Sequence, residues 1–437
     1  MPGAGLLTGG WRRAARPETR RSPLPNSDLP SLVDAAPGHR GSAREVFAAF
    51  LKLGLTSFGG PIAHLGYFRD ELVVRRRWLD EAAYADLVAL CQFLPGPASS
   101  QVGFALGLRR AGALGALAAW TAFTLPSALL LLLVAYSAGA LYGPIGLAVV
   151  HGLKLVAVAI VAQAVWGMAR TLTPDLRRAA IAVLAAILVM MVGGSIGQIA
   201  AIVVGAALGW LLCRGMPSKH AVAVGPLPSR RVGVACLTVF AAILLAGPLL
   251  VTATGWQALA LFDAFYRSGA LVFGGGHVVL PLLEAEVVQS GWTSADVFLT
   301  GYGAAQAVPG PLFAFAAYLG AVVDSPPNGV VGAAIALVGV FLPGFLILLG
   351  VLPFWERLRG WTTAQAALRG TNAAVVGILA FALYDPVITS AVEGPADVGL
   401  ALAGFIALIR WSAPPWAVVV GMVSLQVVVS MAFAAPS

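Results

Sequence analysis

Long apolar stretches separated by short polar segments run through most of the chain. Residues 113–136, 232–253 and 330–354 are examples that exceed the roughly 18 apolar residues of a membrane-spanning helix. A bilayer offers no water to backbone N–H and C=O groups, so apolar stretches of this length form helices. The pattern predicts an all-α integral membrane protein.

The stretches fall into two series with one further stretch between them. The first series covers residues 45–68, 82–108, 113–136, 145–168, 179–192 and 196–213, and the second covers 256–283, 295–323, 330–354, 363–384, 398–409 and 416–433. We therefore divide the chain into a tail (1–43), a first repeat (44–214), a connecting segment with an extra helix (215–255) and a second repeat (256–437). This division predicts roughly 10–13 membrane segments, some of them broken or re-entrant.

Both series begin with the same motif. The chain reads FLKLGLTSFGGP from Phe50 and FYRSGALVFGGG from Phe265. A Pro-Gly-Pro triplet follows Trp78 and Trp292 by 17 residues in both copies (95 − 78 and 309 − 292). A duplicated apolar unit with helix breakers inside its hydrophobic segments is typical of a secondary transporter.

The Pro-Gly-Pro triplets must interrupt a helix, because proline lacks the N–H donor and clashes with the preceding turn. Interrupted backbone inside a membrane is tolerated where it is buried in protein or lines a wet cavity. Each break also creates a helix N-terminus, whose free N–H groups attract anions. The substrate-binding candidates around the two triplets are Gln92, Pro95, Gly96, Pro97, Ser99 and Ser100, and Gln306, Pro309, Gly310 and Pro311. A kink needed only for packing is the alternative interpretation.

Glycines occupy matching positions in the first segment of each series. Gly59 and Gly60 in the first copy correspond to Gly274 and Gly275 in the second. Unwinding at these glycines would turn bare backbone toward the triplets, and we include Ser57 among the binding candidates there. Close packing of helices is the other common use of small residues in membranes.

The short polar segments carry opposite charges in the two copies. The first copy has Arg69, Arg75, Arg76, Arg77, Arg109, Arg110, Arg170, Arg177 and Arg178, whereas the equivalent segments of the second have Glu284, Glu286, Asp296, Asp324, Asp385, Glu393 and Asp397. Residues 137–143 are uncharged, and their counterpart in the second copy holds Arg357 and Arg359. Because Lys and Arg prefer the cytoplasmic side, equivalent loops are expected on opposite sides of the membrane. The repeats are then inverted, with chance asymmetry as the alternative.

Two kinds of charged residue recur at equivalent positions inside or beside the first segments. Lys52 corresponds to Arg267 (267 − 52 = 215) and Glu71 to Glu286 (286 − 71 = 215). An ionisable group at the bilayer centre costs at least about 2.5 kcal/mol, so a matched pair of cations suggests an anionic substrate. The alternative interpretation, with nearly equal weight, is that both cations snorkel to the membrane interface. Glu71, Glu286 and His277 are candidates for a coupling proton, although a solvated loop carboxylate or a structural histidine is the simpler reading of each.

Composition supports the membrane assignment. Hydrophobic residues make up 59% of the chain and charged residues 11%, with a mean hydropathy of +0.88, whereas soluble domains carry roughly 25% charged residues. The formal net charge is +8, but the basic residues lie in the tail and in short loops, so we expect no nucleic-acid binding. The three cysteines have no metal-binding spacing and are expected to pack, and we expect neither a metal nor a cofactor.

The first 43 residues differ from the rest of the chain. They are rich in Arg, Pro, Gly and Ser and have no apolar core, which predicts a disordered cytoplasmic tail. An imprecisely assigned start codon would give the same composition.

Together these residues resemble the chromate ion transporter (CHR) family in its long-chain, two-domain form. The resemblance rests on two copies of a glycine-rich element (50–60 and 265–275), each followed by a tryptophan and then by a glutamine before Pro-Gly-Pro, and it covers residues from about 45 to the C-terminus. Gly276 replaces Pro61 in the second copy, and Leu312 and Phe313 replace Ser99 and Ser100. These departures predict an asymmetric site with more donors from the first copy.

The resemblance implies export of chromate across the bacterial inner membrane and chromate resistance, with sulfate as a competing dianion. The lipid bilayer is the other expected partner, and the sequence leaves a homodimer open. We expect the proton-motive force to drive transport, because the chain has no nucleotide-binding P-loop. Transport of sulfate or another oxyanion is the nearest alternative. A membrane enzyme or scaffold is a distant one, because the apolar segments contain no catalytic arrangement of side chains.

Overall fold

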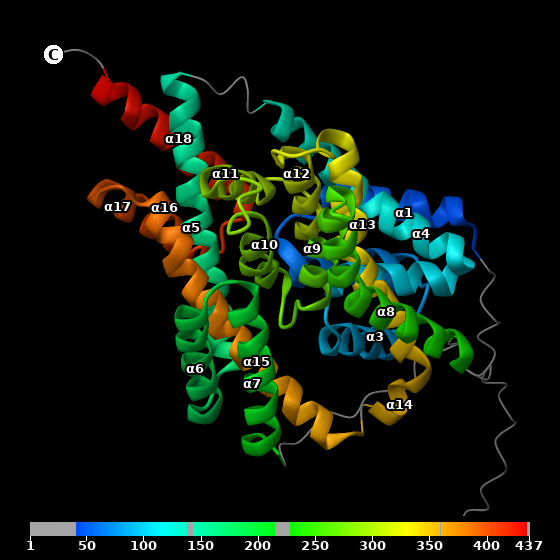
Figure 1. The fold of residues 1–437 in the computed structure, drawn as a ribbon. Helices are drawn as coiled ribbons and strands as arrows, with labels where there is room; N and C mark the ends of the chain where they lie inside the picture. The colour runs from blue at the N-terminus through cyan, green and yellow to red at the C-terminus, as the bar shows by residue number, and fades with distance from the viewer. Residues whose placement is uncertain (1–40, 138–142, 215–227, 359, 435–437) are drawn as a thin grey trace, which may run out of the picture. The chain divides into compact units, whose positions relative to one another are not determined.

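The computed structural model describes residues 41–137, 143–214, 228–358 and 360–434. The predicted tail lies outside the described residues except for its last three. The first half forms α1 (Ala43–Thr56), α2 (Gly60–Phe68), the π-helical η1 (Arg69–Arg75), α3 (Glu81–Phe93), α4 (Ala98–Ser137), α5 (Pro144–Leu172), α6 (Leu176–Val192) and α7 (Gly194–Leu212), and α8 (Arg230–Thr254) follows it (Figure 1).

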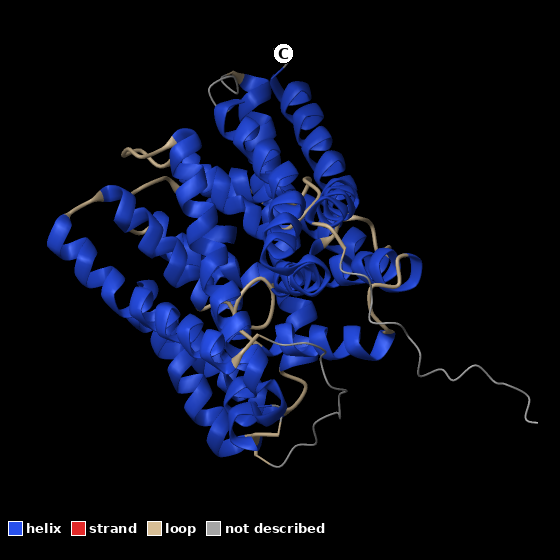
Figure 2. Ribbon diagram, turned by 90° about the vertical axis from the view of Figure 1, so that its right-hand side faces the viewer, coloured by secondary structure: helices blue, strands red, loops and turns tan. Residues whose placement is uncertain are grey.

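The second half contains more elements than the first, and several of them are short. It forms α9 (Gln257–Ala270), η3 (Gly276–Val278), α10 (Val279–Val287), α11 (Ala295–Ala305), η4 (Leu312–Ala314), α12 (Phe315–Val322), α13 (Gly329–Val351), η5 (Leu352–Phe354), α14 (Trp355–Leu358), α15 (Thr362–Ala382), η6 (Leu383–Ile388), α16 (Thr389–Ala391), α17 (Pro395–Arg410) and α18 (Pro415–Ala434). Throughout the described residues the regular structure is helical and contains no strand (Figure 2). The all-α prediction is confirmed.

Local sequence explains where several of these helices begin. At the start of α3 the Asp80 Oδ1 accepts a hydrogen bond from the Ala83 N–H at 2.7 Å, and at the equivalent start of α11 the Ser294 Oγ accepts one from the Val297 N–H at 3.2 Å. Such side chains satisfy N–H groups that the first helical turn leaves free. Gly112, with φ 65° and ψ −157°, divides α4 into two helices, in agreement with the separate apolar stretches 82–108 and 113–136.

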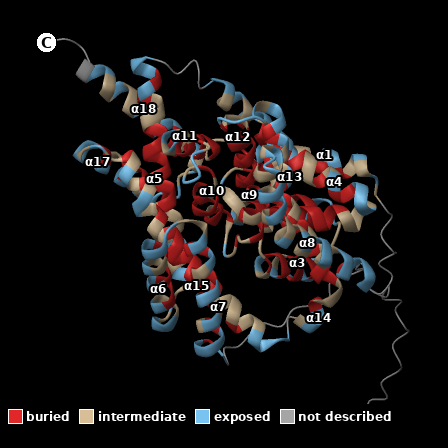
Figure 3. Ribbon diagram, viewed as in Figure 1, coloured by how far each residue is buried: buried red, intermediate tan, exposed pale blue. Residues whose placement is uncertain are grey.

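Seven helices within the described residues are long and apolar enough to cross a membrane. The apolar windows of Pro144–Leu172 and Gly329–Leu358 are each 67% buried inside the protein, whereas that of Arg230–Thr254 is only 6% buried. Figure 3 shows burial concentrated in α5 and in α9–α13. Apolar side chains that protrude from α8, such as Leu245 and Leu249, suit contact with lipid tails rather than water. The chain is thus a multi-pass membrane protein.

Each half packs one long helix against helices of the other half. α5 lies against α17 and α18 of the second half, and α15 lies against α6 and α7 of the first half (Figure 1). Each of these two long helices therefore packs on the last two helices of the other series. These packing contacts join both halves around one buried apolar cluster.

Candidate functional site

The glycine motifs interrupt the first helix of each half. Between α1 and α2 the backbone turns at Gly59 (φ 102°) and Gly60 (φ 81°), and between α9 and η3 it turns at Gly274 (φ 76°) and Gly275 (φ 147°). Side chains with a Cβ rarely adopt these φ values, which glycine adopts without steric cost. The sequence itself therefore sets the position of both interruptions.

The Pro-Gly-Pro triplets interrupt the chain between α3 and α4 and between α11 and η4, and each triplet binds the glycine turn of the other half. The Gly96 N–H donates to the Val272 carbonyl at 2.8 Å. The Gly310 N–H donates to the Ser57 carbonyl at 2.9 Å. These reciprocal hydrogen bonds bring the four interrupted segments together.

Two side chains of α4, a helix with an internal proline, hold the triplets in place. The Ser127 Oγ on α4 donates to the Pro309 carbonyl at 2.6 Å. The Gln101 Nε2 donates at 2.9 Å to both the Pro95 carbonyl and the Gly344 carbonyl of α13. Each triplet is therefore anchored to the proline-containing helix of the other half. Sequence reasoning missed Gln101, whose signal was a glutamine in an otherwise apolar helix four residues after the triplet.

A small cavity lies where the glycine turn of the first half meets the triplet of the second half. Its lining includes Gly59, Gly60, His277, Gln306, Gly310 and Pro415. The Gln306 Nε2 is buried and has no hydrogen-bond partner in the described part of the chain. The His277 Nδ1 lies 2.8 Å from the Tyr302 hydroxyl. Because an unsatisfied buried donor costs about 1–3 kcal/mol, Gln306 is ready to bind an acceptor atom that enters the cavity.

The other predicted donors are distributed unequally. Ser99 and Ser100 are buried in the first turn of α4, and the hydroxyls of Ser57 and Ser100 lack partners among the residues described. Gln92 is exposed on α3, although it is the sequence equivalent of Gln306. The sequence predicted more donors from the first copy, whereas the polar side chains that line this cavity, His277 and Gln306, belong to the second half.

The predicted cations and the predicted proton-coupling carboxylates bind each other. The Lys52 Nζ lies 2.7 Å from the Glu71 Oε2, and the Arg267 Nη2 lies 2.9 Å from the Glu286 Oε2. Each pair spans a glycine turn, because it links α1 to η1 in the first half and α9 to α10 in the second. Both the cation and the carboxylate recur 215 residues later, so the sequence already carried a signal that they belong together. Sequence reasoning nevertheless interpreted the two kinds of residue separately.

Further contacts fix the protonation of the first carboxylate. Burial alone would raise the pKa of the Glu71 carboxyl, but hydrogen bonds from Lys52 and Arg76 and the nearby positive charges outweigh it and lower the pKa to about 2. Arg75 also contacts this carboxylate, at 2.8 Å. A carboxyl that stays ionised at neutral pH is a poor carrier for a proton.

Two polar contacts between the halves were not predicted. The Lys154 Nζ, on a largely buried side chain of α5, lies 2.8 Å from the Asp296 Oδ1 at the start of α11. The His151 Nε2 lies 2.9 Å from the Asp397 Oδ1 on α17. A single lysine inside the apolar stretch 145–168 was the signal for the first contact, because a buried cation requires a partner.

Interrupted helices that meet inside a multi-pass helical protein are the construction typical of membrane transporters. A family model described as chromate transporter matches residues 44–210 and 259–427, so one match falls in each half. The chain belongs to the chromate transporter family.

Named relatives match most of the chain. It is 30% identical over 387 residues to a probable chromate transport protein of Synechococcus elongatus, covering 87% of this chain and 92% of that protein. It is 28% identical over 388 residues to a chromate transport protein of Pseudomonas aeruginosa, covering 84% and 87% respectively. A chromate transport protein of Cupriavidus metallidurans is 25% identical over 391 residues, which cover 87% of this chain and 90% of the relative. No solved structure matches the chain.

Proposed function

We propose that the protein is a secondary transporter that exports chromate across the bacterial inner membrane and thereby gives chromate resistance. The relatives from Pseudomonas aeruginosa and Cupriavidus metallidurans are named chromate transport proteins. The observation that carries the proposal is the cavity between the first glycine turn and the second triplet, where a buried amide donor has no acceptor. An oxyanion supplies the acceptor oxygens that this cavity lacks.

The proposed anion site uses neutral donors. The first turn of α2 leaves N–H groups without intrahelical acceptors, and its positive dipole end favours negative charge. Gln306 and His277 complete the donor set from the opposite wall. The Gly96 and Gly310 amides do not contribute, because both already donate to the other half.

In this proposal Lys52 and Arg267 act mainly as positioning residues. Each neutralises a carboxylate and holds the two sides of a glycine turn together. Direct binding of the dianion by these cations is the alternative, and it requires the anion to displace Glu71 or Glu286 from its ion pair.

We further propose that residues 44–214 and 256–437 are inverted repeats, that the N-terminus is cytoplasmic and that the proton-motive force drives export. The two separate family-model matches support a repeat, and the reversed loop charges support its inversion. An inverted pair lets one site open alternately to the two sides of the membrane. Coupling to protons is favoured by the lack of a P-loop in the sequence.

The test is uptake of labelled chromate by everted membrane vesicles that contain the protein. We expect uptake to collapse with a protonophore and to fall when excess sulfate is added. Sulfate has the same charge and shape as chromate, and a difference of only about 1.4 kcal/mol in binding free energy already gives a tenfold preference. Vesicles that take up sulfate but no chromate would support the sulfate transporter instead. Vesicles that transport neither anion would contradict the proposal.

A further inference from the structure

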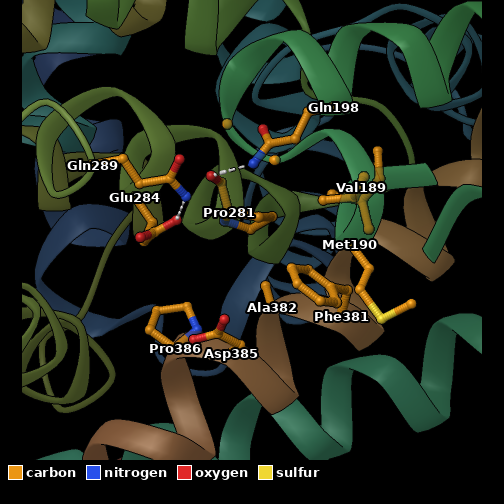
Figure 4. A pocket seen from close by; sticks show the side chains of 13 residues that line it. Val189, Met190, Gln198, Pro281, Glu284, Gln289, Phe381, Ala382, Asp385 and Pro386 are labelled. Carbon is orange, nitrogen blue, oxygen red and sulfur yellow. Dashed lines mark hydrogen bonds between the residues drawn. The ribbon is translucent and has the colours of Figure 1, made fainter. Parts of the chain in front are cut away.

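A second cavity lies between α6, α7, α10 and the junction of α15 with η6. The side chains around it include Gln198, Glu284, Gln289, Phe381 and Asp385 (Figure 4). It shares no lining residue with the cavity at the glycine turn. Gln198 and Glu284 extend toward it from two different helices (Figure 4). The cavity is thus a separate polar pocket in the second half and its neighbouring helices.

Glu284 is a buried carboxyl group without a positive partner. It is 7% exposed, and its Oε2 accepts a hydrogen bond from the Gln289 Nε2 at 3.0 Å. No Lys, Arg or His within the described ranges forms an ion pair with it. Arg267 on α9 instead forms an ion pair with Glu286, which also lies on α10.

The groups that face Glu284 from the other elements favour its neutral form. η6 contributes the carboxylate of Asp385, whereas the lining side chains of α6 and α15 are apolar. Burial, reinforced by the negative charge of Asp385, raises the pKa of the Glu284 carboxyl to about 7, against a smaller opposing effect of the Gln289 hydrogen bond. Glu284 thus differs from Glu71, which three cations hold in the ionised form.

α7 supplies an acceptor for a protonated carboxyl group. The Gln198 Nε2 donates to the Pro281 carbonyl at 2.8 Å, which fixes the orientation of the amide (Figure 4). The Gln198 Oε1 is buried and has no partner in the described part of the structure. Gln198 itself is only 4% exposed. A neutral carboxylic acid has one O–H donor, which this cavity can accept, whereas a carboxylate has none.

We propose that Glu284 is the residue that takes up and releases the coupling proton, through the cavity between α6, α7, α10 and η6. The inference rests on the proposed proton-driven transport. In the uptake step a hydronium ion loses one O–H bond and becomes water, while an O–H bond forms on one carboxylate oxygen of Glu284. In the release step that carboxyl O–H bond breaks and the proton passes to a water molecule, which becomes hydronium. Because Glu284 and Glu286 lie on one turn of α10, the change of charge at Glu284 acts on the helix that Arg267 ties to the second glycine turn.

The experiment uses the full chain in proteoliposomes with a pH-sensitive dye inside. Two rates are measured, the chromate flux driven by a pH gradient and the chromate–chromate exchange without a gradient, which needs no net movement of protons. We expect Glu284→Gln to lower the gradient-driven flux at least tenfold while exchange continues. Glu356→Gln, which removes an exposed carboxyl group on α14, is the matched control and should behave as the wild type.

A second variant covers the case in which Glu284→Gln does not fold. Glu284→Asp keeps a carboxyl group whose ordinary pKa is lower, so its gradient-driven flux should reach half its maximum at a lower pH than in the wild type. Gradient-driven flux at the wild-type level and with the wild-type pH profile in both variants overturns the role of Glu284. A flux that follows a sodium gradient instead of a pH gradient overturns the assignment of the proton. If the wild-type protein shows no chromate–chromate exchange, the proposed transport function itself is contradicted. Failure of the proposed function can thus be distinguished from failure of the proposed role of Glu284.

Discussion

Side chains at equivalent positions of the two halves differ in their surroundings, and Gln306 with Gln92 is the clearest case. Gln306 lines the cavity with its Nε2 buried and unpartnered in the part of the chain described, whereas Gln92 is exposed on α3. A hydrogen bond to a charged group contributes about 1.5–3 kcal/mol. If Gln306 binds the oxyanion, the loss of its donor weakens binding by that amount.

We therefore predict that Gln306→Leu lowers the kcat/KM of chromate transport at least about tenfold, since 1.4 kcal/mol is a factor of ten. Gln92→Leu is the control, because it makes the same chemical change at the equivalent sequence position. It should leave kcat/KM within about twofold of the wild type. Uptake kinetics in everted vesicles, normalised to protein level, measure both variants. Equal losses in the two would contradict the cavity as the anion site.

The carboxyl groups show what the sequence alone could predict about single residues. The equal spacing of Lys52 to Arg267 and of Glu71 to Glu286 predicted that both pairs matter, but it assigned one pair to the substrate and the other to the proton. The structure joins them in ion pairs. A pKa depends on burial and on neighbours that are distant in sequence, so Glu284 could not be told apart from other loop carboxylates by its position alone.

At the scale of the elements, the interruptions were predictable because glycine and proline act locally. The positive φ values of Gly59, Gly274 and Gly310 occur at the motifs that the sequence marks. The packing partners were not predictable. An apolar stretch gives the length of a helix but not its neighbour, so nothing in the sequence indicated that α5 packs on α17 and α18 while α15 packs on α6 and α7.

The reciprocal contact between triplets and glycine turns makes a prediction about Gly310. Its φ of 99° is unfavourable for any residue with a Cβ, and an added Cβ would meet the Ser127 Oγ and lie 3.2 Å from the Phe123 carbonyl. The left-handed conformation alone costs about 1–2 kcal/mol. Gly310→Ala should therefore displace the triplet from Ser57 and Ser127 and reduce chromate transport at least about tenfold.

Gly167→Ala is the matched control for this variant. Gly167 lies inside α5, and an added Cβ there meets no atom within 4 Å. Alanine favours a helix over glycine by about 1 kcal/mol, so this variant should transport as the wild type and unfold at the same or a higher temperature. Chromate uptake and thermal unfolding in detergent compare the two variants. Wild-type transport in Gly310→Ala would show that the triplet can move without loss of function.

At the scale of the whole molecule, the sequence predicted the all-helical membrane fold. It also predicted more membrane segments than the seven helices that reach spanning length in the described residues. The difference lies partly in shorter helices such as α6 and α17, and in the interrupted segments α1–α2 and α9–α10. Hydropathy reports how apolar such pieces are, but the burial of each piece against the rest of the protein depends on packing.

The opposite orientation of the two halves is the remaining prediction at this scale. The residues directly after η1 include Arg76 and Arg77, whereas the residues between α10 and α11 contain no Lys or Arg, so the cytoplasmic preference of Lys and Arg predicts that the two segments lie on opposite sides of the membrane. Single cysteines at Arg77 and Ser290, both exposed, test this in a background without Cys91, Cys213 and Cys236. With a membrane-impermeant maleimide, Arg77→Cys should react only in everted vesicles and Ser290→Cys only in intact cells. If both positions react from the same side, the halves are parallel, and one site could not be exposed alternately by exchanging the roles of the two copies.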